Sequence, residues 1–382
     1  MTRHGIIGLI GAIALAAPSC GHNRSASTAA GDVALRSENG INIYALTGAN
    51  MLAPAAAAAR PLVYVPNSRG ASVTVIDPKT YAVVRTFRTG ELPQHVVPAY
   101  DLDTLWVANN KSNTLTPIDP RTGEPGKQVR VDDPYNMYFT PDGQFALVIA
   151  ERRRRLDFRG AHDMKLVQSI PTNCRGIDHV EFTADGRYAI ATCEFSGQLM
   201  KLDLTTRAVV GYLKVDSNHV SMPQDIRSSA DGQTFFAADM TAGGVWVIDP
   251  VAFKRIGFIR TGRGAHGIYP SRDGRMLYVT NRGWSTLAAG RRGPGSISVL
   301  DPEKREVVAT WPVPNGGSPD MGNVTADGKE LWVSGRYDDE VYVFDTETGK
   351  MTHRIAVGRE PHGLCVWPQP GRYSLGHTGN MR

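Results

Sequence analysis

The sequence predicts an all-β protein, a seven-bladed β-propeller of four-stranded antiparallel blades, and two repeating features predict it. Apolar strands that end in aspartate recur 42–52 residues apart, with one double interval, at Asp77, Asp119, Asp203, Asp249, Asp301 and Asp345. Asp-Gly pairs between apolar runs recur at Asp142, Asp185, Asp231, Asp273 and Asp327. Asp-Gly is a strong hairpin signal, and a period of about 40–50 residues is typical of propeller blades.

The clearest copy of the repeat spans residues 331–367 and contains four short strands, LWVSG, EVYVFD, MTHRIAV and HGLCVW. A turn containing Asp345 and Gly349 separates the second strand from the third, and glycine adopts positive φ there at low cost. The middle strands are almost entirely apolar, which favours strands covered on both faces. The segment RRLDFRGAHDMKLV fills the double interval, so the sequence contains seven units.

The two ends of the repeat region predict how the ring closes. The chain enters the ring at 62–67 with the second strand type and leaves it after 362–367 with the first type. We expect these segments to pair, because pairing completes the first blade and removes two open sheet edges.

The strand LYVTN at Leu277–Asn281, with VYVPN at Val63–Asn67 and LWVAN at Leu105–Asn109, resembles the YVTN-repeat β-propeller family. Members are extracytoplasmic proteins related to surface-layer propellers and, more distantly, to the propeller that holds haem d1 in cytochrome cd1 nitrite reductase. The resemblance covers residues 61 to 373. It implies the fold strongly and the function weakly, since one fold hosts many functions.

The composition is that of one soluble, turn-rich domain. Hydrophobic residues make up 41% of the 382 residues and charged residues 21%, with 40 Gly and 24 Pro. The net charge of +5 is small for this length and does not indicate nucleic-acid binding. We expect a monomer.

The N-terminal residues predict export. Residues 1–20 have a basic start and a short apolar stretch, as a signal peptide does. The sequence around Cys20 is similar to a lipobox, which would attach a lipid to Cys20 and anchor the protein to the cell envelope; cleavage without an anchor is the alternative. We interpret residues 21–60 as a flexible linker with a short strand at 41–46, 61–373 as the propeller and 374–382 as a tail.

Polar residues at the start of each inner strand predict a collar at one mouth of the channel. The first column is Gln94, Tyr135, Asp178, Gln224, His266, Asp320 and His362. The next column is His95, Asn136, His179, Asp225, Gly267, Met321 and Gly363. The remaining positions of these strands are mostly apolar, so the polar columns are candidate ligand-binding residues.

His266, Asp320 and His362 lie at one register on three consecutive blades. Two imidazoles and a carboxylate suit a divalent transition metal. The alternative is a hydrated collar in which these groups bond to each other. From the haem d1 resemblance, a further alternative is a tetrapyrrole with His266 or His362 as axial ligand.

Cys174 and Cys193 form a second candidate cluster. Antiparallel pairing about the turn at 184–186 is expected to bring Cys193 opposite Asp178, so both thiols lie near the collar. A disulfide, two free thiols and thiolate ligation of a metal all remain open, although the offset of about four residues argues against an easy bridge.

Three functions follow as hypotheses. The first is a non-catalytic scaffold that binds a small ligand or a protein partner at the collar. The second is a metal-dependent lyase, lactonase or oxidoreductase, and the third is a haem carrier. Arg152–Arg155 would suit a carboxylate, a phosphate or haem propionates, or would be a solvated hairpin tip. No C-x-x-C-H, G-x-S-x-G or phosphate-loop motif occurs in a suitable setting.

Overall fold

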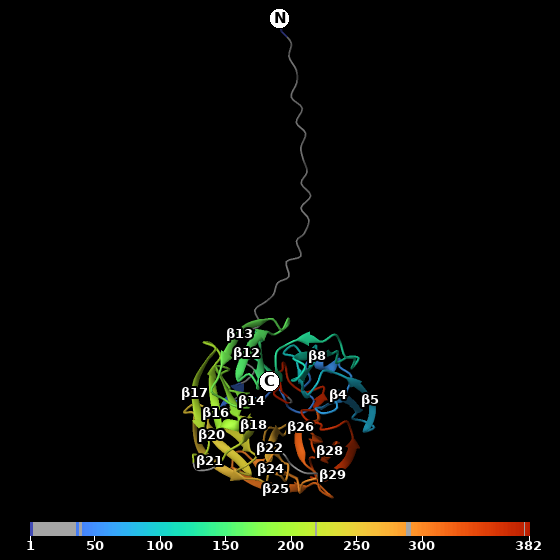
Figure 1. Ribbon diagram of the computed structural model, residues 1–382, viewed down its shortest axis with the longest axis vertical. Helices are drawn as coiled ribbons and strands as arrows, with labels where there is room; N and C mark the ends of the chain where they lie inside the picture. The colour runs from blue at the N-terminus through green and yellow to red at the C-terminus, as the bar shows by residue number, and fades with distance from the viewer. Residues whose placement is uncertain (3–35, 38–39, 218–219, 288–291, 378) are drawn as a thin grey trace.

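The computed structural model describes residues 1–2, 36–37, 40–217, 220–287, 292–377 and 379–382. In this part of the chain, seven four-stranded antiparallel sheets stand around a central axis (Figure 1). The predicted all-β, seven-bladed propeller is therefore confirmed. Apart from residues 1–2, the predicted signal peptide and lipobox, with Cys20, lie outside the described residues.

The strands nearest the axis are β30 (Cys365–Trp367), β6 (Pro93–Pro98), β10 (Pro134–Phe139), β14 (Ile177–Phe182), β18 (Pro223–Ser228), β22 (Ala265–Pro270) and β26 (Pro319–Val324). The second strands are β3 (Leu62–Asn67), β7 (Leu105–Asn109), β11 (Phe145–Ala150), β15 (Tyr188–Cys193), β19 (Phe235–Asp239), β23 (Leu277–Asn281) and β27 (Glu330–Gly335). We call the strands of the first set the inner strands.

The third strands are β4 (Ser72–Asp77), β8 (Thr114–Ile118), β12 (Arg155–Gly160), β16 (Gln198–Asp203), β20 (Gly244–Asp249), β24 (Ser296–Asp301) and β28 (Glu340–Asp345). The outermost are β5 (Ala82–Arg88), β9 (Val129–Arg130), β13 (Leu166–Pro171), β17 (Ala208–Lys214), β21 (Lys254–Arg260), β25 (Glu306–Pro312) and β29 (Met351–Ala356). Smaller elements are β1 (Arg36–Ser37), β2 (Gly40–Ile41), the helix α2 (Pro54–Ala57) and the 3-10 turn η1 (Glu194–Ser196).

Burial falls from the axis to the rim. The inner strands β6, β14, β18, β22 and β26 are buried along their whole length, as is β3, whereas β5 is mostly exposed. Adjacent blades cover both faces of the inner and second strands, which explains why these strands are apolar rather than alternating. The glycines of the five Asp-Gly turns all have φ between 68° and 79°, the left-handed conformation that glycine adopts readily.

The ring closes as the sequence predicts. β30 pairs antiparallel with β3, with Leu62 opposite Trp367 and Tyr64 opposite Cys365. The first blade therefore takes its inner strand from one end of the repeat region and its other three strands from the opposite end.

The segment before the ring differs from the linker we expected. Ile43, Tyr44 and Ala56 are buried, and the Ile43 N–H donates to the Ala230 carbonyl at 2.9 Å. The expected strand at 41–46 is also absent from the described residues: Gly40–Ile41 pairs with Arg36–Ser37, and residues 43–46 form a turn. The apolar residues of this segment pack against the Asp-Gly turns at one end of the propeller. That surface exists only once the ring has folded, so the local sequence does not predict the contact.

The segment 374–382 is not a free tail. It enters the centre of the ring (Figure 1), where Phe139 N–H donates to the Leu375 carbonyl at 2.9 Å and His377 N–H donates to the Met137 carbonyl at 3.2 Å. We call residues 371–377 and 379–382 the plug. Within the described residues no helix is long and apolar enough to cross a membrane.

Candidate functional site

Both predicted polar columns lie where the inner strands β6, β10, β14, β18, β22 and β26 are bulged. In β6 the pairing register with β7 shifts between Pro93 and Val96, and in β22 it shifts between Ala265 and Ile268. β10, β14, β18 and β26 shift at the matching place. A regular strand turns consecutive side chains to opposite faces, whereas a bulge re-aims a side chain. The site is therefore two layers deep.

Asp320 is the centre of a charged cluster at the collar. Its two carboxylate oxygens lie 3.2 Å from His266 Nδ1 and 2.6 Å from His362 Nδ1. Arg282 Nε donates to the same carboxylate at 2.7 Å, and Arg336 Nη1 lies 3.6 Å from it. Burial alone would raise the pKa of Asp320, but Arg282 and the two histidines outweigh burial and hold the pKa well below its usual range.

The three residues predicted as metal ligands thus do lie together. Asp320, however, is already balanced by two arginines, so its charge is satisfied by the protein itself. Burial lowers the pKa of His362 to about 4, with Arg336 acting in the same direction. This arrangement matches the alternative in which collar groups bond to one another, and the metal assignment to these three stays a prediction.

A second histidine cluster lies in the deeper layer. His95 of β6, His179 of β14 and His377 of the plug each offer a ring nitrogen within 4.8 Å of the others. The ring centroids of His179 and His377 are 4.4 Å apart, and that of His95 lies 4.9 Å from His377. Burial holds the pKa of all three imidazoles well below the usual value, which favours their neutral form. The sequence predicted two of these residues; it missed His377, although the neighbouring apolar Leu375 and Met381 were a signal that the segment docks.

Asn136 connects two rings of this cluster. Its side-chain nitrogen lies 3.1 Å from His179 Nδ1 and 3.2 Å from His377 Nδ1. The Met137 N–H donates to Asn136 Oδ1 at 2.8 Å, which fixes the amide so that its NH2 group faces the rings. Tyr138 Oη lies 3.2 Å from His179 Nδ1.

Carboxyl groups gather on the third and fourth blades. Burial raises the pKa of Asp178 well above its usual value, and the neighbouring Glu194 adds to this effect. Burial also raises the pKa of Glu194, and burial with Glu194 and Asp133 raises the pKa of Glu151 to about 7. Gln224 donates to Glu194 Oε1 at 2.9 Å. The collar therefore has an acidic side, opposite the arginines of the sixth and seventh blades.

The other predicted collar residues hold the ring together. Asp225 accepts a hydrogen bond from the Ile268 N–H of the next blade at 2.9 Å and lies 3.3 Å from Arg227. Ser68 donates to Gln94 Oε1 at 3.3 Å. The Tyr135 ring packs edge-on against His95, with centroids 5.4 Å apart.

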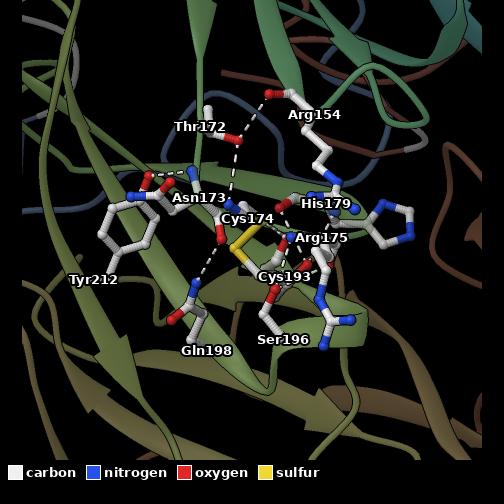
Figure 2. Close-up of a disulfide and its surroundings, with 11 residues drawn as sticks. Arg154, Thr172, Asn173, Cys174, Arg175, His179, Cys193, Ser196, Gln198 and Tyr212 are labelled. Atoms are coloured by element: carbon white, nitrogen blue, oxygen red, sulfur yellow. Dashed lines mark hydrogen bonds between the residues drawn. A yellow bond between two sulfur atoms is a disulfide. The ribbon is translucent and has the colours of Figure 1, made fainter.

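Cys174 and Cys193 form a disulfide (Figure 2), with Cα atoms 5.2 Å apart. The pairing offset, from which we expected no easy bridge, does not prevent the bond. Cys193 pairs with Ile177 rather than Asp178, and Cys174 lies in the loop before β14, which is free to fold back onto the strand pair. Thiolate ligation and two free thiols are excluded while this bond is intact. Cys365 is a buried free thiol.

The arginine run has a local structural role. Arg152 Nε donates to the buried Asp133 carboxylate at 2.6 Å, and its Nη2 donates to the Asn110 carbonyl at 2.7 Å. Arg155 Nε lies 2.9 Å from Asp157. The contact from Arg152 to Asn110 links the third blade to the second, whereas the Arg155–Asp157 contact lies within β12.

The far end of the channel is closed by the plug. Ser374 Oγ donates to the Pro98 carbonyl at 2.9 Å, and Asn380 Nδ2 donates to the Val180 carbonyl at 3.2 Å. Gly371 N–H donates to the Met51 carbonyl at 3.1 Å, which ties the plug to the segment before the ring.

Fold and site define a seven-bladed β-propeller whose axis holds the plug at one end and a buried cluster of histidines, carboxyl groups and arginines at the other. Residues 39–371 match the model of the YNCE-like beta-propeller family, and the chain belongs to this family. No curated protein matches the chain.

Several solved structures share the fold at low sequence identity. A putative 6-phosphogluconolactonase from Bacteroides uniformis is 20% identical with a TM-score of 0.64, covering 80% of this chain and 98% of that one. Dihydro-heme d1 dehydrogenase NirN in complex with DHE is 16% identical with a TM-score of 0.58, covering 80% and 74%. Kuenenia stuttgartiensis hydrazine synthase is 19% identical with a TM-score of 0.59, covering 70% and 87%. Their different names agree with a fold that does not specify one function.

Proposed function

We propose that this chain is an exported, envelope-associated propeller that acts as a non-catalytic binding scaffold through its collar. The observation that carries the proposal is the convergence of polar side chains from all seven blades at one end of the axis, while the plug fills the opposite end. Binding proteins commonly hold small ligands in concave sites with a few convergent polar groups.

The charge distribution at the collar indicates the chemistry of the ligand. Asp178, Glu194 and Glu151 lie on one side and have raised pKa values. Arg336, with a side chain 17% exposed, lies on the other side. A small polar molecule with a hydroxyl or amino group toward the carboxyls and an acceptor group toward Arg336 is complementary to this mouth.

Export is supported by the disulfide between Cys174 and Cys193. Disulfides persist in oxidising compartments such as the periplasm and the cell surface. A lipid anchor on Cys20 would then hold the propeller at the envelope. Cell fractionation tests this: the wild type is expected in the membrane fraction and a Cys20→Ser variant in the soluble exported fraction, whereas a cytoplasmic wild type would contradict export.

The binding proposal is tested by native mass spectrometry of the protein purified from its host without chelator. A mass excess is expected in the wild type and is lost in an Asp178→Asn/Gln224→Ala variant. Asp103→Asn, an exposed change at the opposite face, is the control and should retain the excess. A wild type with no bound molecule, or a double variant that retains it, would contradict a collar site.

The alternatives have different readouts. A metal-dependent enzyme at the collar requires about one equivalent of metal that a His266→Ala variant loses. A haem carrier requires a visible absorption band from the tetrapyrrole. Elemental analysis and an absorption spectrum of the same preparation separate both from the scaffold.

A further inference from the structure

The deeper histidine layer carries an inference that needs no ligand at the collar. We propose that His95, His179 and His377 form a binding site for a divalent transition metal, and that the plug completes it by supplying His377. The three imidazoles come from the second blade, the fourth blade and the plug, which meet only in the closed ring.

The donor set fits such an ion. One ring nitrogen of each histidine lies within 4.8 Å of the other two. A tetrahedral ion with Zn–N distances of about 2.0–2.1 Å places its ligands ~3.3 Å apart, so the rings need to approach by only about 1.5 Å. Neutral imidazoles are ligands for zinc, cobalt, nickel and copper, and three of them with one open position are an established donor set.

His95 is the observation that points to a missing partner. The imidazole is fully buried, and within the described residues neither Nδ1 nor Nε2 has a hydrogen-bond partner. A buried polar atom left unpaired costs about 1–3 kcal/mol, so native proteins rarely retain two on one ring. The His95 ring also lies directly against the backbone of Gly363. A Cβ at this position would collide with His95 Nδ1, so only glycine leaves room for the imidazole.

The other two rings are already aimed at a common point. His179 Nδ1 and His377 Nδ1 both lie within 3.2 Å of the Asn136 side-chain nitrogen. Because an NH2 group donates to both, both lone pairs converge on this nitrogen. An ion near this position would receive the same two lone pairs, and Asn136 would withdraw.

A carboxyl group next to the cluster is placed to orient His179. Asp178 Oδ1 lies 3.3 Å from His179 Nε2, on the ring side opposite Nδ1. Metal-ligating histidines commonly present their second nitrogen to a carboxylate, which orients the ring. His362 is placed to act as a fourth ligand: its ring centroid lies 4.8 Å from that of His95, its Nδ1 contacts Asp320 at 2.6 Å, and its Nε2 has no partner among the described residues.

The experiment uses residues 21–382, freed of metal with chelator and titrated with Co²⁺, whose visible absorption reports nitrogen ligation and geometry. One Co²⁺ per chain is expected. His377→Ala should weaken binding by more than about 100-fold, since losing a second-shell partner alone costs 10- to 100-fold. His162→Ala, which removes an imidazole 73% exposed at the surface, is the matched control and should bind as the wild type does.

Two outcomes overturn the proposal: a wild type that does not bind Co²⁺, and a His377→Ala variant that binds it as tightly as the wild type. If His377→Ala does not fold, the X-ray absorption spectrum of the Co²⁺-loaded wild type decides instead. Three or four imidazole ligands support the site, and a shell of oxygen ligands alone refutes it. Neither readout depends on a collar ligand, so this site and the proposed function fail separately.

Discussion

Arg382 donates from its guanidinium to the Glu181 carboxylate at 2.8 Å, and the two side chains are 5% and 0% exposed. Glu181 also accepts hydrogen bonds from the backbone N–H groups of Phe182 and Ser228. This buried pair attaches the plug to the fourth and fifth blades and so holds His377 in the channel.

Arg382→Ala is expected to lower the free energy of unfolding by about 3–5 kcal/mol, because it leaves a buried carboxylate without its cation. Urea denaturation measures this. Arg275→Ala is the control: it breaks an exposed pair with Asp273 and should change stability by less than about 1 kcal/mol. Equal small effects of the two substitutions would show that the plug is not anchored here.

Truncation before Pro361 is expected to abolish cooperative folding of the ring. The deletion removes β30 and the plug, which exposes the edge of β3 and empties the channel. Thermal unfolding followed by circular dichroism checks this. A truncated chain that melts in one transition near the full-length temperature would refute the closure mechanism.

A Cys174→Ser/Cys193→Ser variant is expected to be less stable by about 3 kcal/mol, since the bond closes a loop with a sequence separation of 19. Thiol titration of unfolded, unreduced residues 21–382 should find one thiol, Cys365. Reduced wild type should be about as stable as the variant. Three titratable thiols without reductant would contradict the disulfide.

Stability is expected to fall as pH rises from about 4.5 to 7 through the contribution of Glu151. Burial raises its folded-state pKa from 4.5 to about 7, so in this range the folded state binds more protons than the unfolded state. Glu151→Gln removes the pH-dependent contribution of this side chain to the free energy of unfolding. The melting temperature of the variant relative to the wild type should therefore increase between pH 5 and pH 8, and a constant difference would refute the raised pKa.

The sequence predicted the ring because its evidence is local. Asp-Gly turns such as Asp231-Gly232 and apolar strands such as SVTVID specify hairpins from neighbouring residues alone. The pairing of β3 with β30 was predictable from the order of the strands. The first blade lacks an inner strand at the start of the repeat region, and one inner strand is left over at its end, so the two complete one sheet.

The candidate site was predicted in part. His95 and His179 were expected at the collar because columns at equivalent strand positions share a height in a propeller. Their depth was not expected, because the bulges that turn two consecutive residues inward depend on inter-strand pairing. The sequence also left the disulfide open, because Cys174 lies in the loop before β14. The position of a loop residue does not follow from the pairing register of the strands.

By itself, the sequence determined the class of fold, the number of blades and the polar mouth. Each of these follows from a local residue pattern that recurs in every blade. Only the tertiary structure decided that the plug fills the channel and that His377 meets His95 and His179. The reason is distance along the chain: His377 lies far in sequence from both partners, and only the closed ring, with its empty axis, creates the surface on which the plug is buried.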